Sequence, residues 1–284
     1  MQNAKVKDLF DEIKNELTSL YGERESESIA KNYLLDRFQF DAIQLAMNKG
    51  IEYDQALLRN DLIRLEEGIP YQHVVGFTYF FGHKFLTTPD ALIPRPETEE
   101  LVDWIITDYR ESSPIILDIG TGTGCIPLSL KSALPESTCI GIDISEEALA
   151  LAKRNASALE IDIVFDKCDI LNERLPTDAY DVIVSNPPYI PVSEKQLLHK
   201  NVIEHEPDLA LFVADNDPII FYRTIAEQAL NSLKSGGALY FEIHESFGED
   251  VLKMLKSYGF LKVKLAQDLQ GKDRMIRAYK PIDR

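Results

Sequence analysis

The chain has 284 residues, a length that favours two domains, and its 45% hydrophobic and 27% charged residues are typical of a soluble globular protein. Its formal net charge of −17 argues against a protein that grips nucleic acid, because such proteins usually present a basic face. No apolar run approaches the roughly 20 residues of a membrane span, and the acidic and basic N-terminus resembles neither a signal nor a transit peptide, so we expect a cytoplasmic protein without membrane contact.

Residues 3–67 have the spacing of amphipathic helices. Apolar side chains recur every three or four positions, as at Leu9, Ile13, Leu17 and Leu20. Gly22, Gly50 and the sequence Gly-Ile-Pro at residues 68–70 interrupt this pattern, as expected between helices. We therefore predict a small N-terminal helical bundle over residues 1–76.

The segment 77–94 has a different composition, rich in residues that favour strands. Aromatic side chains dominate its first half, and the sequence Gly-His-Lys at residues 82–84 is suited to a turn between two strands. We predict a β-hairpin here, which would link the helical bundle to the remainder of the chain.

Residues 95–284 alternate between short β-branched runs and helical stretches. The expected strands cover residues 115–119, 139–142, 163–165, 182–184, 238–243, 261–265 and 275–279. Alternating strands and helices with buried strands predict an α/β domain with a doubly wound, mostly parallel, Rossmann-like sheet of seven strands. Only a short turn precedes the last run, so we expect it to pair antiparallel with its neighbour.

A glycine-rich loop follows the first of these strands, and it consists of Gly120, Thr121, Gly122, Thr123 and Gly124. Glycine permits a left-handed backbone and close approach of a ligand, and the helix after it offers free N–H groups, which together indicate a nucleotide-like ligand. A plain strand-to-helix turn is the simpler alternative. A dinucleotide-binding loop is a second alternative, but Cys125 occupies the last glycine position of the GxGxxG pattern that such loops have. Asp118 before the loop suits a ligand with a positive group, such as the ammonium of S-adenosylmethionine.

The next two strands also end in acidic residues. Asp143 lies about 20 residues beyond the glycine loop, where a carboxylate can accept both hydroxyls of a ribose. Asp143 could instead cap the following helix, although Ser145 could do so equally well. Asp169 could accept a hydrogen bond from an adenine amino group while Ile170 packs on the ring, or it could be a solvated loop residue.

The tetrapeptide Asn186-Pro187-Pro188-Tyr189 follows the fourth strand. Prolines have no N–H, and they hold the preceding residues extended, so this stretch presents carbonyl groups. The side-chain oxygen of Asn186 and the carbonyl of Pro187 could accept both hydrogens of one planar NH2 group, with the Tyr189 ring against its face. These residues therefore predict methylation of an amide or exocyclic amine; a rigid turn of two prolines is the alternative.

Neither the cysteines nor the histidines have the spacing of a metal site. The three cysteines, Cys125, Cys139 and Cys168, form no CxxC pair, and the five histidines form no HxxxH pair. We expect reduced thiols and no metal.

The tetrapeptide together with the glycine loop resembles the amino-methylating methyltransferases, which include DNA adenine-N6 methyltransferases and glutamine-N5 methyltransferases of peptide chain release factors. Three further blocks, at residues 70–76, 93–99 and 206–212, are similar to the second group, and the block Ile-Pro-Arg-Pro-Glu-Thr-Glu at 93–99 is the most discriminating. The resemblance covers nearly the whole chain. Ile170, where an aromatic residue is frequent, and His244, where glycine is common, depart from the family pattern.

The resemblance implies methyl transfer from S-adenosylmethionine to the side-chain amide N5 of the glutamine in the Gly-Gly-Gln tip of release factors, which modulates translation termination. The implied catalytic residues are Asn186, Pro187 and Tyr189, and with Pro188 they would hold the glutamine. The implied cofactor-binding residues are Gly120, Thr121, Gly122, Thr123, Gly124, Asp143, Asp169, Ile170, Asn186 and Arg95. DNA adenine methylation is the alternative, which the net charge of −17 disfavours.

Overall fold

The computed structural model describes residues 1–40, 42–197 and 200–282, which form two compact units. The first unit comprises Met1–Phe77 together with Lys200–His205, and the second comprises the remaining residues, beginning at Thr78.

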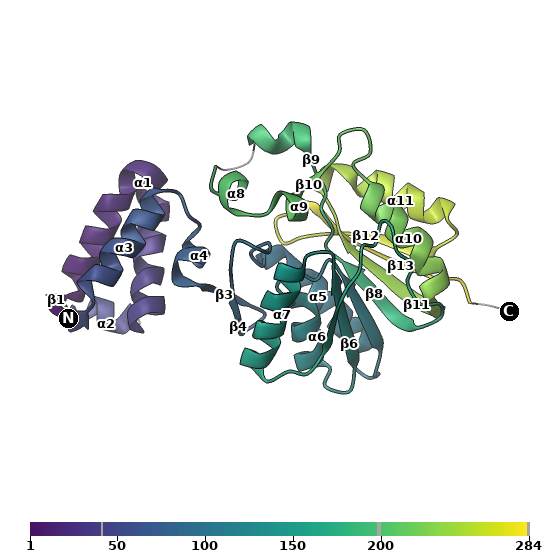
Figure 1. The fold of residues 1–284 in the computed structure, drawn as a ribbon, viewed down its shortest axis with the longest axis horizontal. Helices are drawn as coiled ribbons and strands as arrows, with labels where there is room; N and C mark the ends of the chain where they lie inside the picture. Colours follow the sequence, from purple (N-terminus) through teal and green to yellow (C-terminus); the bar gives the residue numbers. More distant parts are fainter. Residues whose placement is uncertain (41, 198–199, 283–284) are drawn as a thin grey trace. The chain divides into compact units, whose positions relative to one another are not determined.

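The first unit is built mainly from helices around its own apolar core. Its helices are α1 (Val6–Phe38), α2 (Ala42–Ala46), α3 (Gln55–Glu66), α4 (Tyr71–Val75) and α8 (Lys200–His205). In Figure 1, α1 and α3 lie side by side. Leu9, Ile13 and Leu17 are buried, as their spacing predicts, while Gly22 has a φ of 75° and interrupts the helix there. Helix α8 returns to this unit from a distant part of the sequence.

Two segments of this unit differ from the prediction that residues 3–67 are helical. β1 (Gln2–Lys5) and β2 (Gly50–Tyr53) form an antiparallel two-stranded sheet. Their four-residue length carries too little periodicity to distinguish a strand from a helix, and their pairing joins segments that are distant in sequence. The prediction was wrong at these two places.

The predicted β-hairpin is present, and all of it except Phe77 belongs to the second unit. β3 (Phe77–Phe80) and β4 (His83–Leu86) form a two-stranded sheet connected by Phe81 and Gly82. Phe80 and Phe85 are almost completely buried in the same apolar cluster as the residues of the large sheet. The segment is therefore more than a flexible connection.

The second unit contains a seven-stranded sheet of the predicted Rossmann-like type. Its strands are β5 (Ile115–Ile119), β6 (Thr138–Asp143), β7 (Val164–Lys167), β8 (Tyr180–Ser185), β11 (Leu233–Glu242), β12 (Leu261–Gln267) and β13 (Asp273–Tyr279). Their spatial order is β12-β13-β11-β8-β5-β6-β7. Only β13 runs antiparallel to its neighbours, as predicted.

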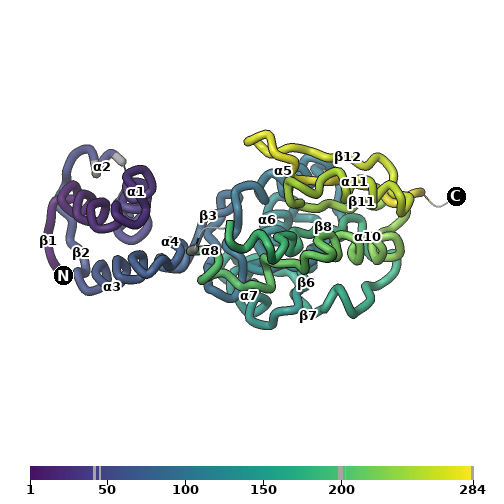
Figure 2. Tube along the Cα trace, turned by 90° about the horizontal axis from the view of Figure 1, so that it is seen from above, coloured from purple at the N-terminus to yellow at the C-terminus, as the bar shows by residue number. Residues whose placement is uncertain are grey.

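Helices cover both faces of this sheet (Figure 1). They are α5 (Pro96–Tyr109), α6 (Cys125–Ala133), α7 (Glu146–Leu159), α10 (Ile220–Ser232) and α11 (Gly248–Ser257). Consecutive strand residues alternate between the faces, so Val182 and Val184 pack with α5 and α6 while Ile183 packs with α10. Figure 2 shows β8 within this unit from a second direction.

Several short elements lie within the loops that follow strands β8 and β11. They are β9 (Ile190–Pro191), β10 (Phe212–Val213), α9 (Asp208–Leu211), and the 3-10 helices η1 (Val192–Leu197) and η2 (Glu245–Phe247). β9 and β10 pair in parallel. Among the described residues, no helix combines the length and apolar character that crossing a membrane requires.

The strand order changes direction between β5 and β8, because the chain builds β6 and β7 on one side of β5 before placing β8 on the other. In open α/β sheets, ligands bind in the crevice outside the carboxyl ends of the strands at such a switch point. The glycine loop after β5 and the tetrapeptide after β8 both lie there.

Candidate active site

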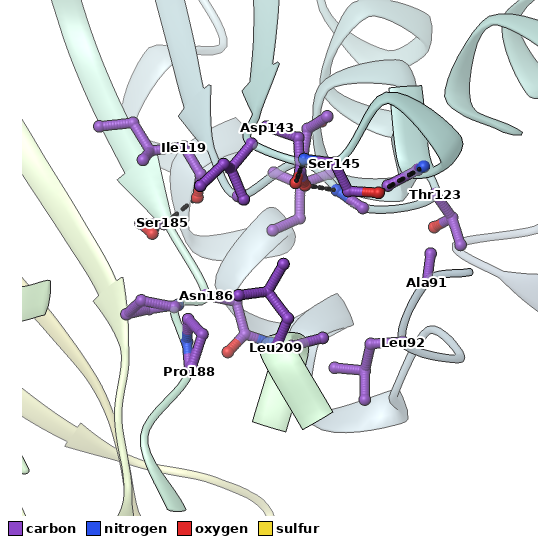
Figure 3. Close-up of a pocket in the computed structure, with 18 of the residues that line it drawn as sticks. Ala91, Leu92, Ile119, Thr123, Asp143, Ser145, Ser185, Asn186, Pro188 and Leu209 are labelled. Carbon is purple, nitrogen blue, oxygen red and sulfur yellow. Dashed lines mark hydrogen bonds between the residues drawn. The ribbon is translucent and has the colours of Figure 1, made fainter. Parts of the chain in front are cut away.

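A cavity of about 240 Å³ opens at this switch point, near the lower end of the size range of small-molecule sites. Segments that follow four different strands line it, together with residues 90–98 before and within α5. Figure 3 shows side chains from these segments arranged around the cavity.

The glycine loop has a backbone that only glycine adopts readily. Gly120, Gly122 and Gly124 have φ values of 73°, 54° and 78°. At Gly124, an added Cβ would lie 3.1 Å from both Leu128 Cδ1 and Phe165 Cζ, so this position also lacks space for a side chain. The loop is held by the amide of Gly120, which donates to the carbonyl of Ile142 at 2.9 Å. A fixed strand-to-helix loop results. Gly120, Thr121, Gly122 and Thr123 line the cavity, whereas Gly124, also predicted to bind the cofactor, is not among the lining residues.

Asp143 ends β6 and lines the same cavity. Its carboxylate accepts hydrogen bonds from the amides of Gly122 at 2.9 Å and Ser145 at 3.0 Å. Burial raises the pKa of Asp143, and these amides act in the opposite direction. Ser145 caps α7 through its hydroxyl, which accepts from the amide of Ala148, so Asp143 is not needed as the cap. Each carboxylate oxygen can still accept a further hydrogen bond.

Asp169 and Ile170 follow β7 and also line the cavity. Asp169 is half-buried and accepts from the amide of Leu171 at 3.0 Å and from the side chain of Asn172 at 2.8 Å. Ile170 is buried, and its carbonyl accepts a hydrogen bond from the side chain of Gln228 on α10 at 2.8 Å. The loop therefore offers one polar and one apolar group to the cavity.

The Asn186–Pro188 part of the tetrapeptide lines the cavity opposite the glycine loop. Just before it, the hydroxyl of Ser185 donates to the carbonyl of Ile119 at 2.7 Å, which ties the ends of β8 and β5 together (Figure 3). Asn186 Nδ2 donates to the hydroxyl of Thr98 at 3.4 Å. This buried threonine was not identified from the sequence, although it lies in the 93–99 block.

Tyr189 has surroundings that the sequence did not indicate. It is not among the residues that line the cavity. Its hydroxyl donates to Glu242 at the end of β11, at 3.3 Å, and its ring packs edge-on against His244 with centroids 5.8 Å apart. Burial and the nearby Glu242 carboxylate raise the pKa of the Tyr189 hydroxyl. Its predicted contact with a planar acceptor group stays a prediction.

Arg95 lines the cavity and is held by a buried carboxylate. Its guanidinium donates to Glu206 at 2.6 Å, and the same carboxylate accepts from the amide of Ile93 at 3.2 Å. Glu206 is distant in sequence from the 93–99 block, and its carboxylate fixes that block through these two hydrogen bonds. Its place in the 206–212 block was the only sequence signal for it. Glu97 does not line the cavity.

Asp118 differs from the expectation that it would face a positively charged ligand. The residue is completely buried, and it is not among the residues that line the cavity. Burial raises the pKa of its carboxyl to about 7. Because the residue lies within β5 rather than after it, its side chain points into the layer between sheet and helices.

Comparisons with known proteins agree with this geometry. Residues 111–276 match a sequence family described as a methyltransferase domain. The release factor glutamine methyltransferase of Flavobacterium psychrophilum is 42% identical to this chain over 279 residues, which cover 96% of this chain and 98% of the relative. The protein of the same description from Bacteroides thetaiotaomicron is 40% identical, with 94% and 97% covered.

A solved structure supports the fold alone. The crystal structure of a methyltransferase from Pyrococcus furiosus superposes with a TM-score of 0.53 at 16% sequence identity, and the match covers 80% of this chain and 98% of that one. The Rossmann-like architecture predicted from the alternation of strands and helices is thus confirmed.

Proposed function

The chain belongs to the release factor glutamine methyltransferases, and from this premise we propose that it transfers the methyl group of S-adenosylmethionine to the side-chain amide N5 of a glutamine in a peptide chain release factor. The observation that carries the proposal is the position of Asn186 and Pro187 on the cavity that the glycine loop and Asp143 also line. Donor and acceptor would thus meet at one switch point of the sheet. The glutamine we propose is that of the Gly-Gly-Gln tip.

The donor has a matching set of groups in the cavity. S-adenosylmethionine supplies the methyl group from its positively charged sulfonium. We assign the glycine loop to the amino acid and sugar portions, where the glycines, which have no side chain, allow close approach. Asp143 would accept from the ribose hydroxyls. Asp169 would accept from the adenine amino group, while Ile170 packs against the ring.

The acceptor amide would be held by oxygen atoms alone. The side-chain oxygen of Asn186 and the carbonyl of Pro187 would each accept one hydrogen of the glutamine NH2 group. Such acceptors increase electron density on a nitrogen whose lone pair is delocalised, and they aim it at the methyl group. Arg95, held by Glu206, would shape the rim of the cavity.

The reaction does not call for a strong base in the cavity. The amide nitrogen keeps both hydrogens until the methyl group is transferred, and one can leave afterwards to solvent. Among the residues that the structure describes, none that lines the cavity is a histidine. Orientation and electrostatic stabilisation would therefore supply most of the rate enhancement.

Mass spectrometry of a release factor after incubation with the protein and isotopically labelled S-adenosylmethionine tests the proposal. We expect one methyl group on the Gly-Gly-Gln glutamine. Label on adenine in added DNA, with none on the release factor, would favour the alternative in which the same NH2-binding loop serves DNA adenine methylation. A cytoplasmic location, expected from the sequence, would place the enzyme with this substrate.

The variant Asn186→Ala should lower kcat by about 100-fold or more, because it removes an acceptor that orients the reacting nitrogen. Binding of S-adenosylhomocysteine, measured by calorimetry, should remain within a few-fold of the wild type. Asn231→Ala, at an exposed position of α10, is the matched control. Undiminished turnover of Asn186→Ala would remove this residue from the mechanism.

A further inference from the structure

Thr98 on α5, which also lines the cavity, contacts both Asn186 and Glu242 at the end of β11. We infer that the two buried residues Thr98 and Glu242 determine which way round the Asn186 amide is held, so that its oxygen faces the acceptor NH2 group. They are positioning residues, since neither needs to touch a reacting atom. The inference rests on the proposed function and assigns it two further residues.

The direction of the hydrogen bonds follows from the chemistry of the groups. The Thr98 hydroxyl lies 2.6 Å from Glu242 Oε2, and both side chains are almost completely buried. An ionised carboxylate can only accept, so Thr98 must donate its single hydrogen to Glu242. The Thr98 oxygen is then left with lone pairs alone. Its other neighbour, Asn186, can satisfy them only with its NH2 group, and Nδ2 lies 3.4 Å away.

Several neighbours favour the ionised form of Glu242, while the pKa of this buried carboxyl is raised overall. Burial raises the pKa of this carboxyl, as does the charge of Glu97. The Thr98 hydroxyl, the positive charge of Arg274 and the Tyr189 hydroxyl act in the opposite direction, because each favours the carboxylate. Glu242 Oε1 accepts from Tyr189 and Oε2 from Thr98, so both oxygens have donors.

An amide carries its oxygen and nitrogen on opposite sides of one planar group. With Nδ2 directed at Thr98, Oδ1 points away from it, and Asn186 lines the cavity. In the opposite orientation, Oδ1 would meet the lone pairs of Thr98 and the NH2 group would meet the NH2 group of the acceptor. Both contacts would be unfavourable, so Thr98 and Glu242 select the orientation that accepts.

Through Glu242, Tyr189 can position the tetrapeptide even though Tyr189 does not line the cavity. The carboxylate holds the first residue of the tetrapeptide through Thr98 and the last residue directly. The two prolines between them restrict the backbone. Tyr189 thus positions the loop through its hydroxyl. One buried carboxylate thereby fixes both ends of the acceptor loop.

The variants Thr98→Val and Thr98→Ser test the inference in the full-length protein. Valine keeps the size of threonine but offers no oxygen, so we expect kcat on release factor to fall about tenfold, the worth of one hydrogen bond. S-adenosylhomocysteine affinity should change less than twofold. Serine restores the hydroxyl, so it should recover most of kcat. Thr107→Val, on the exposed face of the same helix, is the matched control.

A direct readout of orientation does not depend on the acceptor. In protein with 15N-labelled asparagine and bound S-adenosylhomocysteine, the side-chain NH2 resonances of Asn186 should be shifted by Thr98→Val and retained in Thr98→Ser. Their assignment follows from their absence in Asn186→Ala. Glu242→Gln, which frees Thr98 from donating, should also shift them, and it serves if Thr98→Val does not fold.

The outcomes separate the inference from the proposed function. Wild-type kcat and unchanged Asn186 resonances in both Thr98→Val and Glu242→Gln would overturn the inference, while methylation of release factor by the wild type would keep the proposed function. If the wild type leaves release factor unmethylated but the resonances follow Thr98, the proposed function fails and the orientation stands. A further loss in Thr98→Val/Asn186→Ala relative to Asn186→Ala would contradict action through Asn186.

Discussion

Two aspartates near the carboxyl ends of adjacent strands have opposite surroundings. Asp143 lines the cavity and receives two backbone amides, so its carboxylate is stabilised where a ligand can reach it. Asp118, within β5, is completely buried, and its carboxyl has a pKa raised to about 7. The ionised form of Asp118 is therefore costly near neutral pH.

This burial predicts that protein stability depends on pH through Asp118. The unfolded aspartate has a pKa of about 3.9, so between pH 4 and pH 7 the folded state binds a proton that the unfolded state does not. The free energy of unfolding should consequently fall as pH rises across this window. Asp118→Asn keeps the shape without the charge, so it should raise stability at pH 8 by a few kcal/mol, roughly, and little at pH 4.

Urea unfolding of wild type and Asp118→Asn at pH 4, 6 and 8 measures this difference. Asp162→Asn, at an exposed position before β7, is the matched control. An equal effect of Asp118→Asn at pH 4 and pH 8 would show that Asp118 ionisation is not coupled to folding.

At the scale of elements, one buried asparagine connects helix α7, strand β4 and the glycine loop. Asn155 accepts from the amide of Leu86 at 2.7 Å, and it donates to the carbonyls of Leu86 and Thr123 at 3.3 and 2.9 Å. All three contacts are with backbone groups, which need partners when buried. The hairpin and the loop that lines the cavity are thereby held by the same side chain.

Asn155→Ala should therefore affect both stability and donor binding. Loss of these hydrogen bonds in a buried setting should lower the free energy of unfolding by about 2 kcal/mol, and a less fixed glycine loop should weaken S-adenosylhomocysteine binding several-fold. Urea unfolding and calorimetry measure the two effects. Asn231→Ala is again the control. If Asn155→Ala is destabilised but binds S-adenosylhomocysteine with wild-type affinity, then the Asn155 contact is not what fixes the glycine loop for donor binding.

At the scale of the whole molecule, each unit has its own apolar core, and the boundary between them follows Phe77, the first residue of the hairpin. The core of the first unit includes Leu9, Tyr33 and Leu62. Phe80 and Phe85 belong to the core of the second unit together with strand residues such as Val182. The hairpin is therefore required by the unit that carries the cavity.

Truncation at two positions tests this boundary. A chain lacking residues 1–76 should fold and bind S-adenosylhomocysteine, but methylate release factor more slowly if the N-terminal unit recognises the substrate. A chain lacking residues 1–90 also loses Phe80 and Phe85, whose removal costs about 3–5 kcal/mol each, a large part of typical domain stability. It should fail to fold. Thermal unfolding followed by circular dichroism compares the two truncated chains. Equal melting temperatures would show that the hairpin does not contribute to the core.

Much of the fold and several parts of the site could be predicted because their signals are local. The strand at residues 115–119 was located at its observed bounds, since a β-branched run before glycines is a property of consecutive residues. The first four residues of the glycine loop, Asp143 and Asn186 followed from their positions at strand ends, and they line the cavity. Parallel strands bring such ends together at one edge.

Thr98 and Glu242 could not be identified in this way. They are 144 positions apart in sequence, and their hydrogen bond exists only because α5 packs beside the end of β11. The burial of Asp118 and the pairing of β1 with β2 likewise depend on neighbours from elsewhere in the chain. Periodicity describes which face of an element is apolar, but it does not say which element covers that face.

The sequence by itself determined the alternation of elements and the groups presented at strand ends, because backbone restriction by proline and glycine and side-chain periodicity act over a few residues. Only the tertiary structure decided that Tyr189 turns to Glu242, that the hairpin completes a core, and that Thr98 receives the Asn186 amide. These contacts join distant segments, and their geometry is fixed only when the elements pack together.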